Sequence, residues 1–270
     1  MTKFNGHSRF NTTTFQETVR FNFAEFSKTV NFVGAKFNNA DFMGDTFNDP
    51  TRFEKVQIDE RIRFHNVNIK KVALRHTDLS KYSFVTCKWD DKGGRYRLYD
   101  ETIFWDDLYM WRFKGDENKI SERIHEIEDL YRQMKQKAQD AHNMYDYSFW
   151  HYSEKEMMWL RTRLIKSPFK WAVLGLYRLF SGFGEEPLKA FGFLLLFVLL
   201  SGWLIGNNGG PVGIEALSTV TLKHLTFLKM KEPLQISNTC GGLLTVFVTR
   251  IVVPLQAALF GFALRNRFRR

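Results

Sequence analysis

Large apolar side chains recur every five residues, and in four places every six, through the first third of the chain. The large positions are Phe10, Phe15, Phe21, Phe26, Phe32, Phe37, Phe42, Phe47, Phe53, Ile58, Phe64, Ile69, Leu74, Leu79, Phe84 and Trp89. Two residues before each stands another, mostly small or β-branched, residue: Ser8, Thr13, Val19, Ala24, Val30, Ala35, Ala40, Asp45, Thr51, Val56, Ile62, Val67, Val72, Thr77, Tyr82 and Cys87. A helix repeats every ~3.6 residues and a strand every ~2, so neither produces this period. The pattern indicates a repeat architecture of short units that stack on one another.

A five-residue unit with one large and one smaller inward side chain suits one side of a square coil, because four sides close a turn. Sixteen units therefore predict about four coils. The segments A-K-F-N-N, A-D-F-M-G and D-T-F-N-D at 35–49, and T-D-L-S-K, Y-S-F-V-T and C-K-W at 77–89, closely resemble pentapeptide-repeat proteins. The resemblance implies a right-handed quadrilateral β-helix, a pentapeptide-repeat solenoid, which we assign to residues 1–90. The six-residue steps predict bulged corners.

The charge of this region bears on its partners. Residues 1–90 contain fourteen Lys and Arg against ten Asp and Glu. Some pentapeptide-repeat proteins resemble DNA in shape and charge, but that mimicry needs an acidic surface. Much of the net charge of +10 lies instead beside apolar segments, at Arg161, Arg163, Lys166, Lys170, Arg178, Lys189, Arg265, Arg267, Arg269 and Arg270. We therefore expect a structural or sensing module with no nucleic-acid partner.

Residues 91–168 are predicted to form an aromatic cap followed by cytoplasmic helices. The sequence DDKGG at 90–94 breaks the period, and the aromatic-rich stretch 96–113 suits a cover for the last open coil. From Ile120 the apolar residues alternate steps of four and three. This spacing predicts a helix, packed either within the chain or in a coiled coil between subunits. The residues SEKE at 153–156 form a capping box, which predicts that a second helix begins there and ends before Pro168.

A short amphipathic segment and a turn occupy residues 169–186. Residues 169–180 mix aromatic, aliphatic and basic side chains over 12 positions, which is too short to span a bilayer. The composition predicts a helix that lies in the membrane interface. The residues GFGEEP at 182–187 are expected to turn the chain into the bilayer.

Residues 187–270 contain two apolar stretches that predict a membrane hairpin. The first, 190–206, has 17 residues without a charge, and the second, 241–264, is about 36 Å long as a helix against a bilayer core of about 30 Å. A buried core helix also fits the first stretch, but two apolar runs with basic outer flanks favour a hairpin. Those flanks place both termini in the cytoplasm. We expect a multi-pass protein of the bacterial inner (cell) membrane, with the lipid bilayer as partner.

The segment between the two spans carries a third pattern. Residues 211–230 show a helical apolar stripe together with Thr219, Thr221 and Thr226. A span, a threonine-bearing half-helix and a second span resemble two-helix pore-loop ion channels, and residues 120–270 resemble bacterial pentapeptide-repeat membrane proteins grouped with such channels. The resemblance implies a homo-oligomer, a tetramer by analogy with pore-loop channels. Because T-V-G-Y-G is absent and K-M-K-E-P follows the half-helix, we do not expect potassium selectivity through a ring of backbone carbonyls.

Arg250 lies near the middle of the second span, where a charge exposed to lipid costs at least about 2.5 kcal/mol. On a regular helix it shares a mostly small-residue face, suited to helix packing, with Val246, Ala257 and Gly261. An adjoining polar face consists of Thr245, Thr249 and Gln256. Arg250 either satisfies backbone carbonyls inside an oligomer or lines an aqueous path. We take Arg250, Thr245, Thr249, Gln256, Thr219, Thr221 and Thr226 as the candidate pore or gate residues.

The sequence favours a membrane ion channel or pore-forming oligomer over an enzyme. The seven histidines show no metal-ligand spacing, Cys87 and Cys240 form no CxxC, and no nucleophile or phosphate-loop motif is present, so we expect no catalytic residues, cofactor or metal. The cytoplasmic β-helix would gate the hairpin in response to a protein or a small molecule. The alternative is a non-conducting scaffold that presents the solenoid to a protein partner. A membrane-depolarising effector in phage defence is a further variant.

Overall fold

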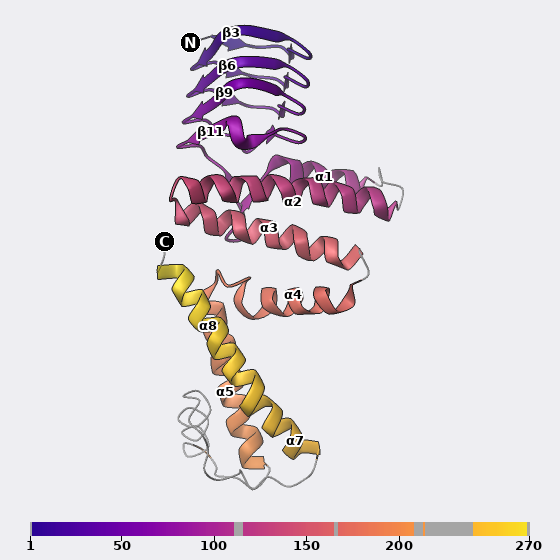
Figure 1. Ribbon diagram of the computed structural model, residues 1–270, viewed down its shortest axis with the longest axis vertical. Helices are drawn as coiled ribbons and strands as arrows, with labels where there is room; N and C mark the ends of the chain where they lie inside the picture. The colour runs from indigo at the N-terminus through magenta and orange to yellow at the C-terminus, as the bar shows by residue number, and fades with distance from the viewer. Residues whose placement is uncertain (1, 111–115, 165–166, 208–212, 214–239, 269–270) are drawn as a thin grey trace. The chain divides into compact units, whose positions relative to one another are not determined.

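The computed structural model describes residues 2–110, 116–164, 167–207, 213 and 240–268. It divides into two compact units, Met1–Pro168 and Phe169–Arg270, which we describe separately. The first unit contains a β-solenoid followed by three helices, and the second contains helices (Figure 1).

The solenoid consists of short parallel strands that stack one coil apart. In chain order they are β1 (Lys3–Phe4), β2 (Ser8–Arg9), β3 (Thr14–Asn22), β4 (Glu25–Phe26), β5 (Val30–Asn31), β6 (Lys36–Met43), β7 (Thr46–Phe47), β8 (Thr51–Arg52), β9 (Gln57–His65), β10 (Val72–Ala73) and β11 (Tyr82–Val85), with a 3₁₀ turn, η1 (Leu79–Lys81), before β11. They form three parallel sheets in the orders β1-β4-β7, β2-β5-β8-β10 and β3-β6-β9-β11. The chain makes about four turns, as the repeat predicts (Figure 1).

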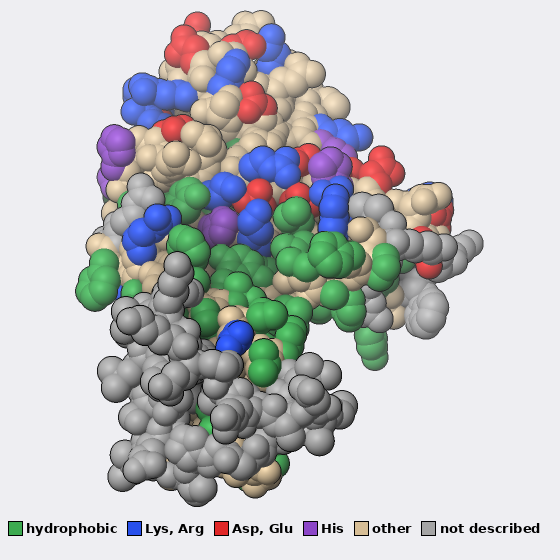
Figure 2. Space-filling model, turned by 60° about the horizontal axis from the view of Figure 1, so that its bottom comes forward, with side chains coloured by type: hydrophobic (Ala, Val, Ile, Leu, Met, Phe, Trp, Pro, Cys, Tyr) green, Lys and Arg blue, Asp and Glu red, His purple; other side chains and the backbone are tan. Residues whose placement is uncertain are grey.

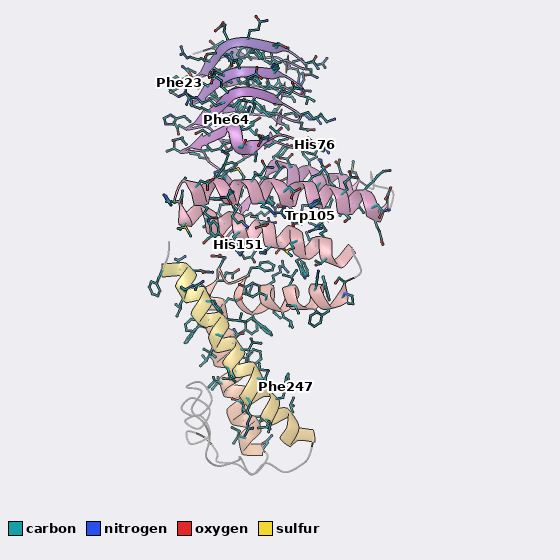
Figure 3. All side chains as sticks on the ribbon, viewed as in Figure 1. Phe23, Phe64, His76, Trp105, His151 and Phe247 are labelled. Carbon is teal, nitrogen blue, oxygen red and sulfur yellow. The ribbon has the colours of Figure 1, made fainter. Side chains whose placement is uncertain are left out.

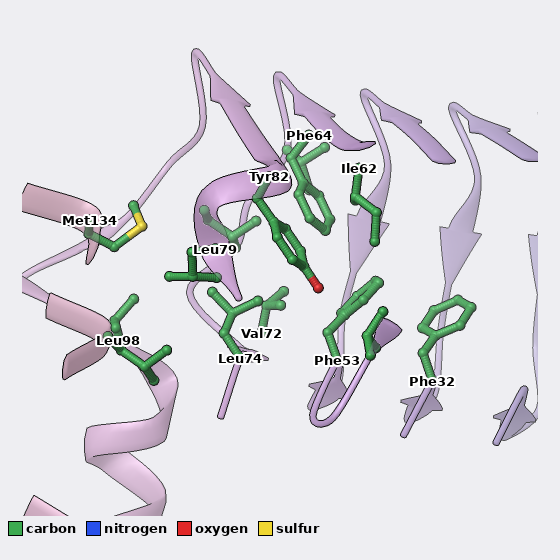
Figure 4. Close-up of a cluster of buried hydrophobic side chains, with 14 of the residues drawn as sticks. Phe32, Phe53, Ile62, Phe64, Val72, Leu74, Leu79, Tyr82, Leu98 and Met134 are labelled. Atoms are coloured by element: carbon green, nitrogen blue, oxygen red, sulfur yellow. The ribbon is translucent and has the colours of Figure 1, made fainter. Parts of the chain in front are cut away.

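The predicted large positions form stacked aromatic columns in the interior. Pairing places Phe21, Phe42 and Phe64 directly above one another, and Phe84 continues the column. Successive ring centroids lie 5.1, 5.0 and 5.6 Å apart, close to the strand spacing of about 4.8 Å. In the last coil Tyr82 takes a smaller inward position, and its buried ring fills the end of the solenoid (Figure 4).

The irregular steps of the repeat appear as register shifts and left-handed corners. The six-residue steps 15–21 and 58–64 lie beside the five-residue step 37–42, and the pairing shifts at Phe15/Thr18 and Phe37/Asn39. Bulging is therefore confirmed along this face. Two corners of the coil each place one residue per turn at positive φ: Thr12, Gly34, Lys55 and His76 at one, and Phe23, Gly44, Asn66 and Thr86 at the other. Phe23 is exposed at its corner (Figure 3).

The last coil is covered by a hairpin and three helices: β12 (Asp90–Asp91), β13 (Tyr96–Arg97), α1 (Tyr99–Tyr109), α2 (Glu117–Asp140) and α3 (Met144–Leu164). Without a further coil, backbone N–H groups at this end would be left unpaired. The Asp100 carboxylate accepts hydrogen bonds from the Leu74 and Arg75 amides at 2.8 and 3.0 Å, and the Gln133 side chain accepts from the Leu79 amide at 2.8 Å. Side chains of the helices thus replace a missing coil.

A buried ion pair fixes α1 within this cover. The Arg95 guanidinium donates to both carboxylate oxygens of Glu101 at 2.6 and 2.8 Å, and the Tyr131 hydroxyl donates to the same carboxylate at 2.6 Å. Burial raises the pKa of Glu101, but these partners outweigh it and hold the pKa below its usual value. Phe104 is buried against the solenoid core, as a cap requires, whereas Tyr109 is exposed.

The helices differ from the sequence prediction at one start. The stripe predicted from Ile120 is confirmed, because Ile124, Ile127, Tyr131, Met134 and Ala138 of α2 are buried in the same core as the solenoid. The capping box at Ser153 was the wrong start, since α3 already begins at Met144. The Ser153 hydroxyl instead donates to the Tyr96 carbonyl, which ties α3 to β13.

The described part of the second unit contains α4 (Pro168–Ser181), α5 (Pro187–Asn207), α7 (Cys240–Phe247), a π-helical turn η3 (Val248–Val252) and α8 (Val253–Phe268). The helix predicted at 169–180 is present as α4, and it exposes Phe169, Trp171, Val173, Leu176 and Leu179. Its placement in a membrane interface stays a prediction. The half-helix predicted at 211–230 lies outside the described residues.

Candidate functional site

Two helices of the second unit are long and apolar enough to span a membrane. Pro187–Asn207 has 21 residues and Leu244–Phe268 has 25, and the mean hydropathy of the most apolar window of 18 residues is 2.2 in the first and 1.8 in the second. In each, only 28% of the most apolar window is buried. A core helix of a soluble protein would be mostly buried, so this exposure favours lipid or further protein as the surroundings.

One stripe of the second helix packs against α5 within the chain. The buried residues of the second helix are Thr245, Val248, Thr249, Val253, Gln256 and Ala263, and those of α5 are Ala190, Val198, Ser201, Leu204 and Ile205. Val253 joins Val198 and Ile205 in one apolar cluster. Thr249 donates its hydroxyl hydrogen to the Thr245 carbonyl at 2.7 Å, so its polarity is satisfied inside the helix.

Gln256 joins three helices at the base of the hairpin. Its Nε2 donates to the carbonyl of Ala190 in α5 at 2.8 Å and to that of Phe180 in α4 at 3.2 Å. The Phe180 carbonyl is near the end of α4, where no amide four residues ahead continues the helix. Asn266 of α8 adds a hydrogen bond of 3.0 Å to the Gly184 carbonyl in the intervening turn. Asn266 was not predicted as a site residue, and only the fold brings it to this turn.

Arg250 lies in the π-helical turn and is exposed. Pro254 explains the turn, because a proline has no amide hydrogen and its ring clashes with the carbonyl four residues earlier, which is that of Arg250. The Val253 amide donates to the Val248 carbonyl, five residues back, and the backbone widens. Residue 254 therefore cannot donate the usual helical hydrogen bond to the Arg250 carbonyl.

The structure separates the predicted candidate residues. Thr245, Thr249 and Gln256 are buried, whereas Arg250 is exposed, as are its neighbours Phe247 and Ile251. The small-residue face predicted to carry helix packing is not the one packed against α5, since Gly261 has open space where a side chain would begin. Thr219, Thr221 and Thr226 lie outside the described residues.

Arg250 has no hydrogen-bond or ion-pair partner among the described residues. The ion pair Lys189–Glu186, at 3.8 Å, lies at the beginning of α5. Between residues 190 and 207, and between 240 and 264, Arg250 is the single charged residue in the sequence. A guanidinium with five donors and no partner among the described residues needs water, an anion or protein oxygen atoms.

The first unit has a concave surface of its own. A cleft of about 340 Å³ lies between the last coil and the α2–α3 turn, and Phe84, Trp89, Asp140, Asp146 and Lys137 contribute to it. Burial lowers the pKa of Lys137, although the nearby acidic side chains oppose this effect. No group of three or more His, Cys, Asp or Glu side chains in the described part of the chain is arranged to hold a metal ion.

Charges on the solenoid surface are mixed. Acidic and basic side chains are interspersed on the face of the first unit drawn in Figure 2. Several form ion pairs between coils, including Arg20–Asp41 at 3.7 Å and Lys36–Asp59 at 3.2 Å. This surface lacks the uniform acidic charge that DNA mimicry requires.

Comparison with known proteins bears on the solenoid alone. Residues 10–57 match a family model described as pentapeptide repeats, in nine copies, and this match covers less than a fifth of the chain. No curated protein and no solved structure matches the chain. The matched residues include strands β3 to β8 and end at the first residue of β9. The solenoid of this chain is thus built of pentapeptide repeats.

Proposed function

We propose that the chain is a channel of the bacterial inner membrane, formed by several copies of the α5–α8 hairpin and regulated by its cytoplasmic solenoid. The observation that carries the proposal is Arg250, which is exposed, has no partner among the described residues and is the single charged residue between 240 and 264. Two spans cannot enclose a pore, so the proposal requires a homo-oligomer, a tetramer by analogy with pore-loop channels.

Energetics argue against lipid as the only neighbour of Arg250. A guanidinium at bilayer depth costs about 2.5–3.5 kcal/mol. The helix begins at Cys240, about 15 Å away at about 1.5 Å per residue. That distance exceeds the reach of an arginine side chain, which therefore does not extend to the end of the helix. Water or a neighbouring subunit relieves the cost of the buried charge.

The cytoplasmic unit is proposed to receive the stimulus. It carries no recognisable catalytic motif in its sequence, and we propose a non-enzymatic role without a cofactor. The cleft beside Trp89 is the concave surface best suited to a small molecule, and the exposed sides of the solenoid suit a protein. Basic residues beside both spans support cytoplasmic termini.

A non-conducting scaffold is the second candidate. The mixed, exposed charges of the solenoid favour a protein-binding surface, and the hairpin would then serve as an anchor. In the depolarising variant of the channel, expression would arrest growth together with loss of the membrane potential.

Two measurements on the purified full chain distinguish these functions: the mass of the complex in detergent and the ion flux through liposomes that contain it. We expect a detergent complex of several subunits that releases ions from liposomes. A monomer would refute every pore, because one hairpin encloses no path. A stable oligomer that shows no ion flux, either without an applied voltage or across a range of voltages, would favour the scaffold. The variant Arg250→Gln should keep its subunit number and change the flux, whereas the matched variant Arg267→Gln, at the end of α8, should behave as the wild type.

A further inference from the structure

The apolar stretches carry charge of one sign only. No acidic residue occurs between residues 190 and 207 or between 240 and 264, and Arg250 is the one basic residue there. In a closed symmetric assembly every subunit contributes this guanidinium at the same depth. The result is a ring of positive charge in a low-dielectric surrounding, where its field is stronger than in water.

From this ring we infer that the path through the assembled hairpins selects small inorganic anions such as chloride. The inference rests on the proposed channel function and adds the class of ion that the same site passes. Rings of Arg or Lys favour anions in membrane pores, because a cation must approach a like charge. A guanidinium offers only hydrogen-bond donors and always carries its charge, so it binds anions without a change of protonation.

Among the described residues, the oxygen atoms near Arg250 do not supply a cation site. Thr245 and Thr249 are buried, and the Thr249 hydroxyl is used inside its own helix. Gln256 is buried with its amide donating to two carbonyls. On the side of Arg250 the exposed neighbours Phe247 and Ile251 are apolar. A cation would therefore meet the guanidinium with few of the oxygen ligands that replace its hydration shell.

The test is the reversal potential of the full chain in planar bilayers across a tenfold gradient of KCl. A fully selective univalent path reverses about 59 mV from zero, since that is the value of a tenfold ratio for one charge. We expect the current through the wild type to reverse near the equilibrium potential of chloride. Arg250→Gln should move the reversal toward zero, Arg250→Lys should keep the chloride preference, and Arg267→Gln serves as the control and should match the wild type.

Each outcome bears on a different claim. A cation-selective current in the wild type overturns the inference and leaves the channel standing. The same holds if Arg250→Gln assembles, conducts and keeps the wild-type reversal potential. If that variant fails to assemble, the comparison of wild type with Arg250→Lys still decides, because loss of chloride preference in the lysine variant contradicts a charge-based ring. An assembled wild type without current refutes the channel and the inference together.

Discussion

Asp45 offers the sharpest test of how the solenoid interior is built. It holds a smaller inward position, its side chain is 2% exposed, and its Oδ1 accepts a hydrogen bond from the Ala24 amide at 2.6 Å. Oδ2 has no hydrogen-bond partner among the described residues. Burial raises the pKa of this carboxyl from 3.8 to about 7, and the Ala24 amide opposes that shift only in part.

The sign of the pH dependence follows from the raised pKa. The folded state binds a proton that the unfolded state has released, so the stability contributed by Asp45 is complete below about pH 4 and is lost as the pH rises to about 7. A shift of about three pH units sets an upper limit of about 4 kcal/mol. Because the group lies beside a solvent-facing corner, water screens the charge, and we expect about 1–2 kcal/mol.

Asp45→Asn removes the charge and keeps the oxygen that accepts from Ala24. We expect the variant to be more stable than the wild type at about pH 8 by about 1–2 kcal/mol, or about 3–6 °C in the unfolding midpoint of a unit this size, and to match it near pH 4. Thermal unfolding followed by far-ultraviolet circular dichroism measures the difference. An equal change at both pH values, or a loss of stability at pH 8, would refute the buried-charge explanation.

Asp41 provides the matched control within the same solenoid. Its carboxylate receives a hydrogen bond of 2.7 Å from Arg63 in the next coil, and this partner lowers the pKa of Asp41 despite partial burial. Its contribution to stability is therefore present above the unfolded pKa and lost in acid. Asp41→Asn should lower the unfolding midpoint at neutral pH and have little effect in acid, which is the opposite of Asp45→Asn.

Two further substitutions test the ends of the elements. Asp100→Asn leaves one of the amides of Leu74 and Arg75 without an acceptor. We expect the free energy of unfolding, measured by urea titration, to fall by about 1–3 kcal/mol. Asp100→Glu, which keeps the charge, serves as the comparison. Gln256→Leu leaves the Phe180 carbonyl unpaired and should lower the thermal midpoint in detergent by a similar free energy, whereas Gln256→Glu should fail to restore it, because a carboxylate cannot donate.

The solenoid was predictable because its period comes directly from coil geometry. The steps of five or six residues predict which side chains point inward. The stacking of Phe21, Phe42 and Phe64 follows from counting four such steps per coil. Even the register shift beside Phe37 was implied by a six-residue step in the strands on either side. The cap was less predictable, since Asp100 meets Leu74 only after the chain has closed on itself.

Which face of the second span packs within the chain could not be predicted from the sequence, although a regular helix already places Thr245, Thr249 and Gln256 on one face. The buried residues Thr245, Thr249 and Val253 follow one another at steps of four, and Gln256 then follows after three. The π-helical turn before Pro254 adds one residue to the helix and rotates everything on one side of it relative to the other. A wheel drawn at constant angle places Arg250 with Gly261 on a packing face. The proline was visible in the sequence, but its structural effect was not.

Movement of α8 against α5 is constrained by the hydrogen bonds that hold the turn between α4 and α5. Gln256 binds the carbonyls of Phe180 and Ala190, and Asn266 binds that of Gly184. At an average of about 0.6 kcal/mol for such bonds between membrane helices, the three contribute about 2 kcal/mol, or a factor of about 20 in population. A stimulus that opens a channel by sliding α8 must therefore favour the released form about 20-fold merely to equalise the two forms. If the proposed channel opens in this way, Gln256→Leu should lower the stimulus needed for opening, because it removes two of the three hydrogen bonds.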